Sequence, residues 1–427
     1  TILPTIAGDT QNGGRAQLIT TVTDTVADST PLNAMIEGRP PVNLGVTNSG
    51  DLYGGSSLTL TDLLGEQQFN VYAASISEYR TMAMSYVNLA RRLQWGTQLF
   101  SQTQFFFGTP TGLSYGLFNR DDAIATTRMR GGTVFGIYPF SKFRRVELSA
   151  GVANFQEQFG SPLLQAASNQ VQTDRFGTTI FRNGTFVPFN IAFIQETTVF
   201  REFGPVSGNT MRLGFEYAPK FGDTLSQQSL DGDARYYHRL GETGLVALRA
   251  RGFRSFGESP NFHFFGGNSE LRGYDYLEFV GHKAFHLNAE LRFPLVEAML
   301  TPIGILGGFR GVFFAGVGGA ALNSESFTPW TSSPETFRPV IGLQYDNNLQ
   351  PQPVYAAPVQ ISGFRLRDAR GSYGFGLETM AFGFPIHLDW TWRTLFNETW
   401  ENYLFAGSGG SAKFRESRFN FWIGYDF

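Results

Sequence analysis

Few residues of this sequence have the type and spacing that covalent chemistry requires. The chain has no cysteine, which removes thiolate nucleophiles, thiolate metal ligands and disulfides. No Gly-x-Ser-x-Gly elbow is present, so a hydrolase of that kind is not expected. We therefore predict no enzyme activity, no metal and no cofactor. A His–carboxylate pair assembled across strands at one rim of a barrel stays open as the enzymatic alternative.

The histidines do not have the spacing of a metal site. His282 and His286 are four residues apart, but in a strand this separation places them roughly 13 Å apart on one face. We expect all five to be polar lumen or loop residues: His238, His263, His282, His286 and His387.

The stretch "GGNSELRGYDYL", Gly266 to Leu277, has a setting suited to binding a carboxylate. It places Arg272 between Glu270 and Asp275, with glycines and tyrosines around them. A guanidinium can hold a carboxylate through two parallel hydrogen bonds. The partner of this arginine depends on the elements that carry the stretch.

Those elements are predicted from composition first. The chain has 50 glycines and 43 phenylalanines in 427 residues, and only 16% of its residues are charged, while its mean hydropathy is -0.15. Strands that alternate lipid-facing apolar with lumen-facing polar residues give this average. The net charge of -3 gives no reason to expect nucleic acid binding.

No membrane helix or leader is expected. The apolar stretch from Met299 to Leu322 contains Pro302 and Arg310, so we predict a turn followed by a glycine-rich strand. The first residues, "TILPTIAGDT", are not a signal peptide, which indicates a mature chain or a fragment.

Period-2 alternation is the main signal for secondary structure. In "HLNAELRF", His286 to Phe293, polar and apolar residues alternate, and the last residues do the same, with Phe421 and Asp426 on opposite faces. The predicted lumen face carries charges that should be paired or hydrated: Arg212, Glu216, Glu290, Arg292, Arg310, Glu378, Asp389 and Arg393. That they only solvate a pore is the alternative.

Sixteen strands are predicted, an even number as single-chain bacterial barrels require. They form a transmembrane β-barrel over residues 42–427, and residues 1–41 form a linker or the tail of an upstream domain. The predicted ranges are 42–47, 52–63, 67–79, 80–89, 93–107, 128–138, 144–157, 188–201, 210–219, 232–240, 243–254, 283–293, 309–320, 368–380, 385–396 and 414–427.

Short turns alternate with long loops, as expected for periplasmic turns and external loops. The long loops are 108–127, 158–187, 220–231, 255–282, 321–367 and 397–413, and the turn at 294–308 is long for its side. The Arg272 stretch lies between the eleventh and twelfth strands, in the sixth external loop.

At this position the sequence resembles the barrel of the BamA–TpsB superfamily, the outer-membrane insertases and two-partner secretion pores. The hallmark is a (Val/Leu/Ile)-Arg-Gly-(Phe/Tyr) tetrapeptide in the sixth external loop, here Leu271, Arg272, Gly273 and Tyr274. The stretches "NAELRFPL", "GSYGFGLETMAFGFPIHLDW" and "FNFWIGYDF" are also similar to the family. The stretches "LTDLLGEQQFNVYAA" and "NLARRLQWG" resemble barrels that follow a TolB-like propeller.

The resemblance implies that the sixth loop folds into the lumen and that Arg272 meets acidic wall residues. Glu290 is the first expected partner, with Glu378 or Asp389 next. The alternative is a solvated external turn. The resemblance also implies a C-terminal assembly signal at Tyr425 and Phe427.

Two departures from the family pattern are visible. Ala315 and Gly316 stand where the family usually has a lumen aspartate, so the arginine contact is expected to be weaker or differently arranged. No POTRA repeat precedes the barrel in this sequence, although such repeats receive clients in the family.

The resemblance implies an integral outer-membrane barrel that inserts, assembles or translocates proteins, with membrane lipid and client or partner proteins as its contacts. A short first strand after Pro40 and Pro41 would weaken the seam between the first and last strands, where client strands could pair. Two alternatives are a non-transporting anchor or structural subunit and a passive pore.

Overall fold

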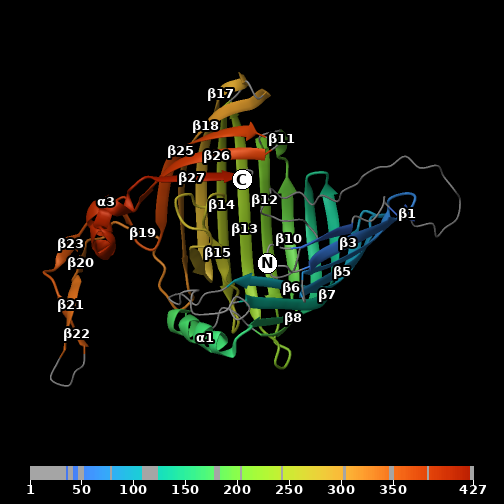
Figure 1. Cartoon of the computed structure of the whole chain (residues 1–427), viewed down its shortest axis with the longest axis horizontal. Helices are drawn as coiled ribbons and strands as arrows, with labels where there is room; N and C mark the ends of the chain where they lie inside the picture. The colour runs from blue at the N-terminus through green and yellow to red at the C-terminus, as the bar shows by residue number, and fades with distance from the viewer. Residues whose placement is uncertain are drawn as a thin grey trace. The chain divides into compact units, whose positions relative to one another are not determined.

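The structure is a computed structural model, shown as a cartoon in Figure 1. It describes residues 35–36, 42–46, 52–76, 79–107, 124–176, 183–201, 204–241, 244–301, 304–345, 351–381 and 384–423. The chain divides into two compact units: Thr1–Glu196 with Arg212–Asp231 and Ser255–Asn261, and Thr197–Met211 with Gly232–Arg254 and Phe262–Phe427.

The first unit is built from antiparallel strands, each paired with the next along the chain. These strands are β3 (Leu52–Thr61), β4 (Gln67–Ile76), β5 (Tyr79–Asn88), β6 (Gln94–Phe107), β7 (Ile124–Ser141) and β8 (Arg144–Phe159). At one end, β1 (Met35–Ile36) and β2 (Val42–Val46) both pair with β3. At the other, β9 (Gly184–Phe186) and β10 (Phe189–Glu196) both pair with β8.

The second unit carries a similar series of antiparallel strands. It runs through β14 (Gly244–Phe256), β17 (Lys283–Thr301), β18 (Gly304–Ala321), β25 (Arg370–Ala381), β26 (Phe384–Thr394) and β27 (Arg418–Ile423). The short β11 (Val199–Arg201) pairs with β12 (Gly204–Ala218). Residues of β12, of β13 (Gln227–Leu240) and of β14 belong to both units.

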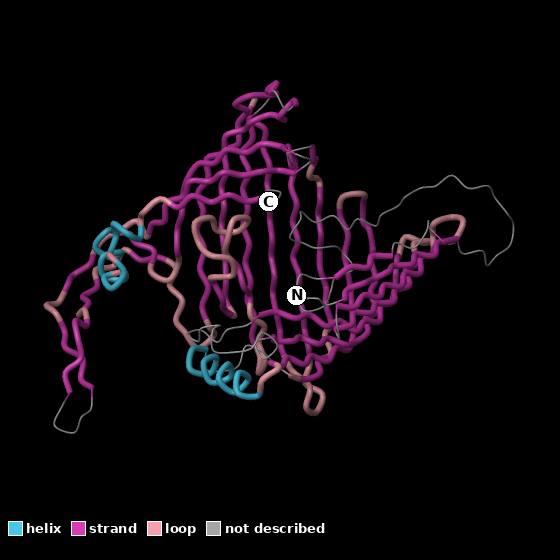
Figure 2. Tube along the Cα trace, in the orientation of Figure 1, coloured by secondary structure: helices cyan, strands magenta, loops and turns pink. Residues whose placement is uncertain are grey.

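The all-β class is confirmed, and each predicted strand range contains a strand of the structure, drawn in magenta in Figure 2. Closure into a sixteen-stranded barrel and the domain boundary at residue 41 stay predictions. Among the described residues, no helix is long and apolar enough to cross a membrane.

The prediction of one continuous strand over 188–201 is wrong, because Thr197 and Thr198 separate β10 from β11. The Thr197 N–H and hydroxyl both donate to the Asn209 carbonyl oxygen, at 2.8 and 3.1 Å. Opposite them, Gly208 has φ +99°, and a Cβ there would lie 2.3 Å from the Thr197 oxygen. This glycine conformation is rarely available to other residues, so the ladder is interrupted here.

The prediction of a long turn over 294–308 is also wrong. Strands β17 and β18 continue their pairing to Thr301 and Gly304. The register shifts between Pro294 and Val296, which fits a proline that cannot donate to the ladder.

Several predicted loops contain secondary structure of their own. The loop 158–187 holds α1 (Pro162–Phe176), and 397–413 holds α2 (Glu398–Leu404), η3 (Ala406–Ser408) and most of α3 (Gly410–Phe414). The final strand therefore begins at Arg418 instead of residue 414. The loop 255–282 contains the pair β15 (His263–Phe265) and β16 (Phe279–Gly281).

The loop 321–367 forms three short antiparallel pairs. They are β19 (Trp330–Thr331) with β24 (Arg365–Leu366), β20 (Glu335–Phe337) with β23 (Val359–Ile361), and β21 (Val340–Tyr345) with β22 (Pro351–Tyr355). This loop and the α2–α3 segment bury a common apolar cluster, which includes Ile361, Leu366, Trp400 and Phe414. Such burial stabilises long loops that have little propensity for structure alone.

Alternation along the strands of the second unit is confirmed. On β17, His286, Glu290 and Arg292 are buried, whereas Leu287 and Leu291 are 45% and 39% exposed. Phe421 is 59% exposed on β27, and Asp426 lies outside the described residues. The strands therefore have one polar, covered face and one apolar, open face.

Candidate functional site

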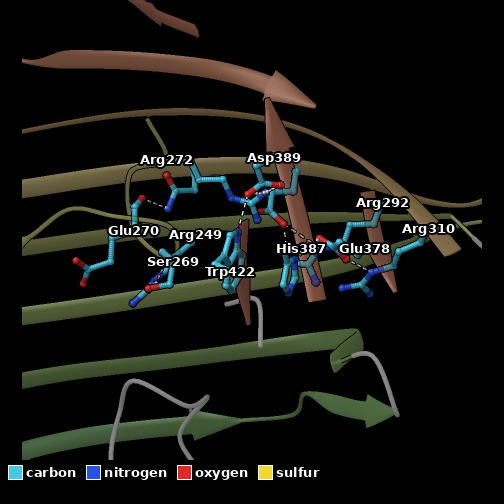
Figure 3. A network of polar contacts seen from close by, with 12 residues as sticks. Arg249, Ser269, Glu270, Arg272, Arg292, Arg310, Glu378, His387, Asp389 and Trp422 are labelled. Atoms are coloured by element: carbon cyan, nitrogen blue, oxygen red, sulfur yellow. Dashed lines mark hydrogen bonds and ion pairs between the residues drawn. The ribbon is translucent and has the colours of Figure 1, made fainter. Parts of the chain in front are cut away.

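The Arg272 side chain is buried between two carboxylates on different strands. Figure 3 shows it beside Asp389. Its Nη2 donates to Glu290 Oε1 on β17 at 2.7 Å, and its Nη1 lies 3.3 Å from Asp389 Oδ2 on β26. The loop arginine thus joins strands β17 and β26 through one guanidinium.

The guanidinium also lies against two aromatic rings. Its Cζ is 4.4 Å from the ring centre of Phe314 on β18 and 5.7 Å from that of Trp422 on β27. A cation over a ring face is attracted to the negative charge density there, more strongly when water is excluded. Four strands, β17, β18, β26 and β27, therefore contribute side chains that contact Arg272.

Each of the two carboxylates has a second donor that fixes its position. Arg292 donates from Nε and Nη2 to Glu290 Oε2, at 2.9 and 2.6 Å. The Trp422 indole N–H donates to Asp389 Oδ2 at 2.7 Å. A buried carboxylate needs several such partners. Glu290 and Asp389 each have one in addition to Arg272.

Glu378 forms an ion pair with Arg310 and lies beside His387, one cross-strand row away from Asp389. Arg310 Nε contacts Glu378 Oε2, and His387 Nδ1 lies 3.3 Å from Glu378 Oε1. The His387 ring stacks on Trp422 with ring centres 3.6 Å apart. Of the expected wall residues, Glu290 and Asp389 meet Arg272, whereas Glu378 belongs to this neighbouring cluster.

Glycines at alternate positions clear the wall beneath the loop. Gly376 faces Asp389 across β25 and β26, and a Cβ at Gly376 would lie 2.2 Å from Asp389 Oδ1. Gly374 faces Phe314 across β25 and β18, and a Cβ there would lie 2.6 Å from Phe314 Cζ. These two glycines leave the space that the carboxylate and the ring occupy.

The residues beside Arg272 in the tetrapeptide pack the loop onto the strands. Leu271 is fully buried in a cluster with Phe265, Tyr274 and Ala284, and the Tyr274 hydroxyl donates to the Gly371 carbonyl at 3.0 Å. Gly273 has φ +85°, and a Cβ there would lie 2.6 Å from Thr391 Cγ2. A larger residue would meet both strain and overlap at this position.

Side chains of three strands also hold the loop backbone. Asn288 of β17 donates to the Glu270 carbonyl at 2.6 Å, Arg418 of β27 to the Gly273 carbonyl at 3.2 Å, and Arg249 of β14 to the Ser269 carbonyl at 3.4 Å. The loop therefore lies along the polar face of the second unit from β14 to β27. We call the cluster formed by Arg272, Glu290 and Asp389 the latch.

Comparison with known proteins identifies the family. A family model described as the Omp85 superfamily domain matches residues 63–427. The chain belongs to the Omp85 superfamily. The expectation of a BamA–TpsB type barrel is confirmed at this level. No curated protein matches the chain.

Solved structures are similar to this chain at low sequence identity. BamA from Haemophilus ducreyi lacking POTRA domains 1–3 is 11% identical with a TM-score of 0.54, covering 90% of this chain and 70% of that one. CdiB from Acinetobacter baumannii is 10% identical (TM-score 0.42, 90% of this chain, 59% of that chain). CdiB from Escherichia coli is 12% identical (TM-score 0.44, 85% and 65%).

In this Omp85 chain a phenylalanine ring on β18, and not an aspartate, lies against Arg272. Ala315 lies on the exposed face of β18, while the neighbouring Phe314 faces Arg272. A Cβ at Gly316 would lie 2.9 Å from Leu271 Cδ1. The ring of Phe314 and the carboxylate of Asp389 thus surround the guanidinium, and the small residue at 316 admits the loop.

Four contributors to this site are not predicted from the sequence: Phe314, Trp422, Gly374 and Gly376. A signal was present, because Gly374 and Gly376 lie two residues apart in "GSYGFG", a spacing that predicts a strand face that something covers closely.

The other predicted site residues lie in separate places. Arg212 pairs with Asp231 at 2.9 Å, and Glu216 accepts from Gln227 at 2.6 Å, both within the first unit. Among the histidines, His263 stacks on Phe253, His286 on Phe265 and His238 on Tyr236. Tyr425 and Phe427 lie outside the described residues.

Proposed function

We propose that this Omp85 barrel is an integral protein of the bacterial outer membrane that inserts, assembles or translocates other proteins. The family assignment supports the broad class of activity. The observation that carries the proposal is the latch, in which a loop arginine is buried between Glu290 and Asp389.

Asp389 links the loop to the last strand, because Arg272 of the loop and Trp422 of β27 both contact its carboxylate. The Asp389 carboxylate faces Nη1 of Arg272, and it also accepts a hydrogen bond from the indole N–H of Trp422 on β27. Arg418, also on β27, donates to the loop carbonyl of Gly273. Displacement of β27 would therefore remove partners from the loop, and release of the loop would leave β27 less firmly held.

The pairings of the first and last strands are short. In the described residues, β2 pairs with β3 from Val42 to Val46, and β27 pairs with β26 from Arg418 to Ile423. By contrast, β25 pairs with β26 along nearly its whole length, from Gly371 to Ala381. A strand with fewer ladder hydrogen bonds separates more easily, and its free edge can accept a client strand.

Reconstitution into lipid vesicles tests this function. Vesicles containing the chain should accelerate folding of a urea-unfolded outer-membrane barrel client relative to empty vesicles, measured by heat-modifiable migration and protease protection. The chain has no cysteine, so a cysteine at Leu44 can be combined with single cysteines scanned from Phe419 to Ile423. A disulfide that joins the first and last strands should abolish the acceleration, and reduction should restore it.

The same experiment separates the alternatives. Client folding at the rate of empty vesicles, with or without the disulfide, would contradict the assembly proposal and favour an anchor or structural subunit. A passive pore would instead show ion conductance in planar bilayers that does not change when residues 266–277 are deleted.

A further inference from the structure

A cavity of about 540 Å³ lies beside the latch, between α3 and the adjoining ends of β26 and β27. Its wall includes Arg393 of β26, Arg418 of β27, Lys413 of α3, and the hydroxyl residues Ser408 and Ser417. This volume is within the range of small-ligand sites, which is roughly 300–1,000 Å³. The cavity is separate from the three latch residues.

The cavity wall has an excess of positive charge. Three of its residues are cationic, and its one carboxylate, Glu416, already contacts Lys413 Nζ. Arg418 lies 3.6 Å from Asp275, whose side chain is 85% exposed, so this pair is weak. Within the described ranges no carboxylate forms an ion pair with Arg393, whose Nε donates to the Phe414 carbonyl at 3.2 Å. An anion would relieve the repulsion between these cations.

One of the cationic groups, Arg393, is held in position before a ligand binds. The Arg393 guanidinium lies 4.7 Å from the ring centre of Phe414, and Phe414 stacks on Phe405 with ring centres 4.1 Å apart. Phe414 is itself buried in the apolar cluster of the loops. A side chain that is already ordered loses less entropy when it binds, which favours affinity.

We propose that this cavity binds a phosphate monoester. Guanidinium groups match the geometry of phosphate oxygens and Lys413 adds a point charge, while Ser408 and Ser417 can donate hydrogen bonds from their hydroxyls. Phe405, which is half-buried and stacks on Phe414, adds an apolar ring to the wall against which a sugar ring can pack. The phosphate could be carried by a lipid headgroup or by a free phosphosugar.

Ligand binding would also stabilise the latch loop. Arg418 donates to the Gly273 carbonyl, and the Arg393 guanidinium lies 5.8 Å from the ring centre of Tyr274. Both cavity arginines therefore contact the tetrapeptide of the loop. A phosphate bound to both arginines would add contacts that keep them against the loop, and so would stabilise the loop as well.

Calorimetric titration of the detergent-solubilised chain tests the proposal without any assembly assay. Glucose 6-phosphate should bind saturably, whereas glucose should not. Lys413→Gln and Arg393→Gln should each weaken binding about tenfold, the loss expected for one charge-assisted contact. Lys220→Gln, which removes a positive charge from the exposed pair with Glu258, is the matched control and should bind as the parent chain does.

Nanodiscs of different lipid composition distinguish the two sources of the phosphate. If the ligand is a lipid headgroup, nanodiscs of phosphatidylcholine with lipid A should block the glucose 6-phosphate titration, while phosphatidylcholine alone should not. If neither blocks it, the free phosphosugar is the ligand. Absence of saturable binding in detergent and in phosphatidylcholine nanodiscs, or equal affinity of the two cavity variants and Lys220→Gln, would overturn the proposal.

Discussion

At the scale of single residues, the latch is a balanced cluster of buried charges. Arg272 and Arg292 meet Glu290, and Arg272 also meets Asp389. Moving such charges out of water is unfavourable, and the cluster is stable only because every member has partners. Removing one member leaves the others buried with too few partners, which makes single substitutions informative.

Arg272→Ala should destabilise the folded chain by about 3–5 kcal/mol, because it leaves Asp389 buried without its cation. Urea unfolding in detergent and heat-modifiable migration measure this loss. Arg272→Lys should recover only part of it, since an ammonium cannot reach both carboxylates as the guanidinium does. Lys220→Ala in an exposed pair serves as control, and equal stability of the Arg272→Ala and Lys220→Ala variants would contradict the latch.

Gly376→Ala tests the space beneath the Asp389 carboxylate. A Cβ at Gly376 would lie 2.2 Å from Asp389 Oδ1, so the carboxylate must move away from Arg272. We expect a loss of about 1–3 kcal/mol, typical of overpacking. Gly252→Ala on β14 is the matched control, because nothing lies within 4 Å of a Cβ there. Similar urea midpoints for the two alanine variants would argue against the close fit.

At the scale of elements, the last strand is held by side chains as well as by its ladder. β27 pairs with β26 from Arg418 to Ile423, and Trp422 adds a hydrogen bond to Asp389 and a stack on His387. Because these contacts lie on the polar face, they connect β27 to the latch. The mobility of β27 should therefore depend on the indole N–H.

Trp422→Phe keeps a ring against His387 but removes the donor to Asp389. The loss should be about 1.5–3 kcal/mol, as for hydrogen bonds to charged groups. It should appear as faster amide hydrogen exchange in β27 than in β25. Trp390→Phe is the control, since Trp390 stacks on Phe375 on the other face of the strands. If hydrogen exchange in β27 does not change in the Trp422→Phe variant, the latch does not hold this strand.

At the scale of the whole molecule, both units expose apolar side chains along their strands. In the first unit Leu99, Val134 and Leu148 are 60%, 58% and 52% exposed, and in the second Phe313 and Phe419 are each 55% exposed. Many large apolar side chains exposed along strands in this way mark a surface that is covered by another apolar phase. For the proposed barrel, this phase is the hydrocarbon of the outer membrane.

Phe313→Arg should hinder folding into lipid vesicles more than folding in detergent. An arginine on a lipid-facing barrel position costs up to about 2–4 kcal/mol, while detergent can adapt around the charge. Tyr355→Arg is the control, because Tyr355 is similarly exposed at 54% but belongs to the hairpin of β21 and β22. Equal vesicle folding of the two variants would contradict lipid contact at Phe313.

The sequence by itself determined the strand class and the motif, because both depend on local order. Period-2 alternation identifies a strand without reference to its partners, so ranges such as 283–293 and 385–396 agree with β17 and β26 apart from their ends. The tetrapeptide around Arg272 is contiguous, which allowed the family and the carboxylates Glu290 and Asp389 to be anticipated. Loop helices such as α1 lacked so regular a pattern and were missed.

Only the tertiary structure decided which side chains meet Arg272. Asp389 is 117 residues away in sequence, and its contact depends on the registers of β25, β26 and β27 together. Those registers place Glu378 one row away, beside Arg310 and His387. Phe314 and Gly376 acquire their roles through the same alignment. Alternation specifies the face of a residue, but its neighbours follow from the pairing of distant strands.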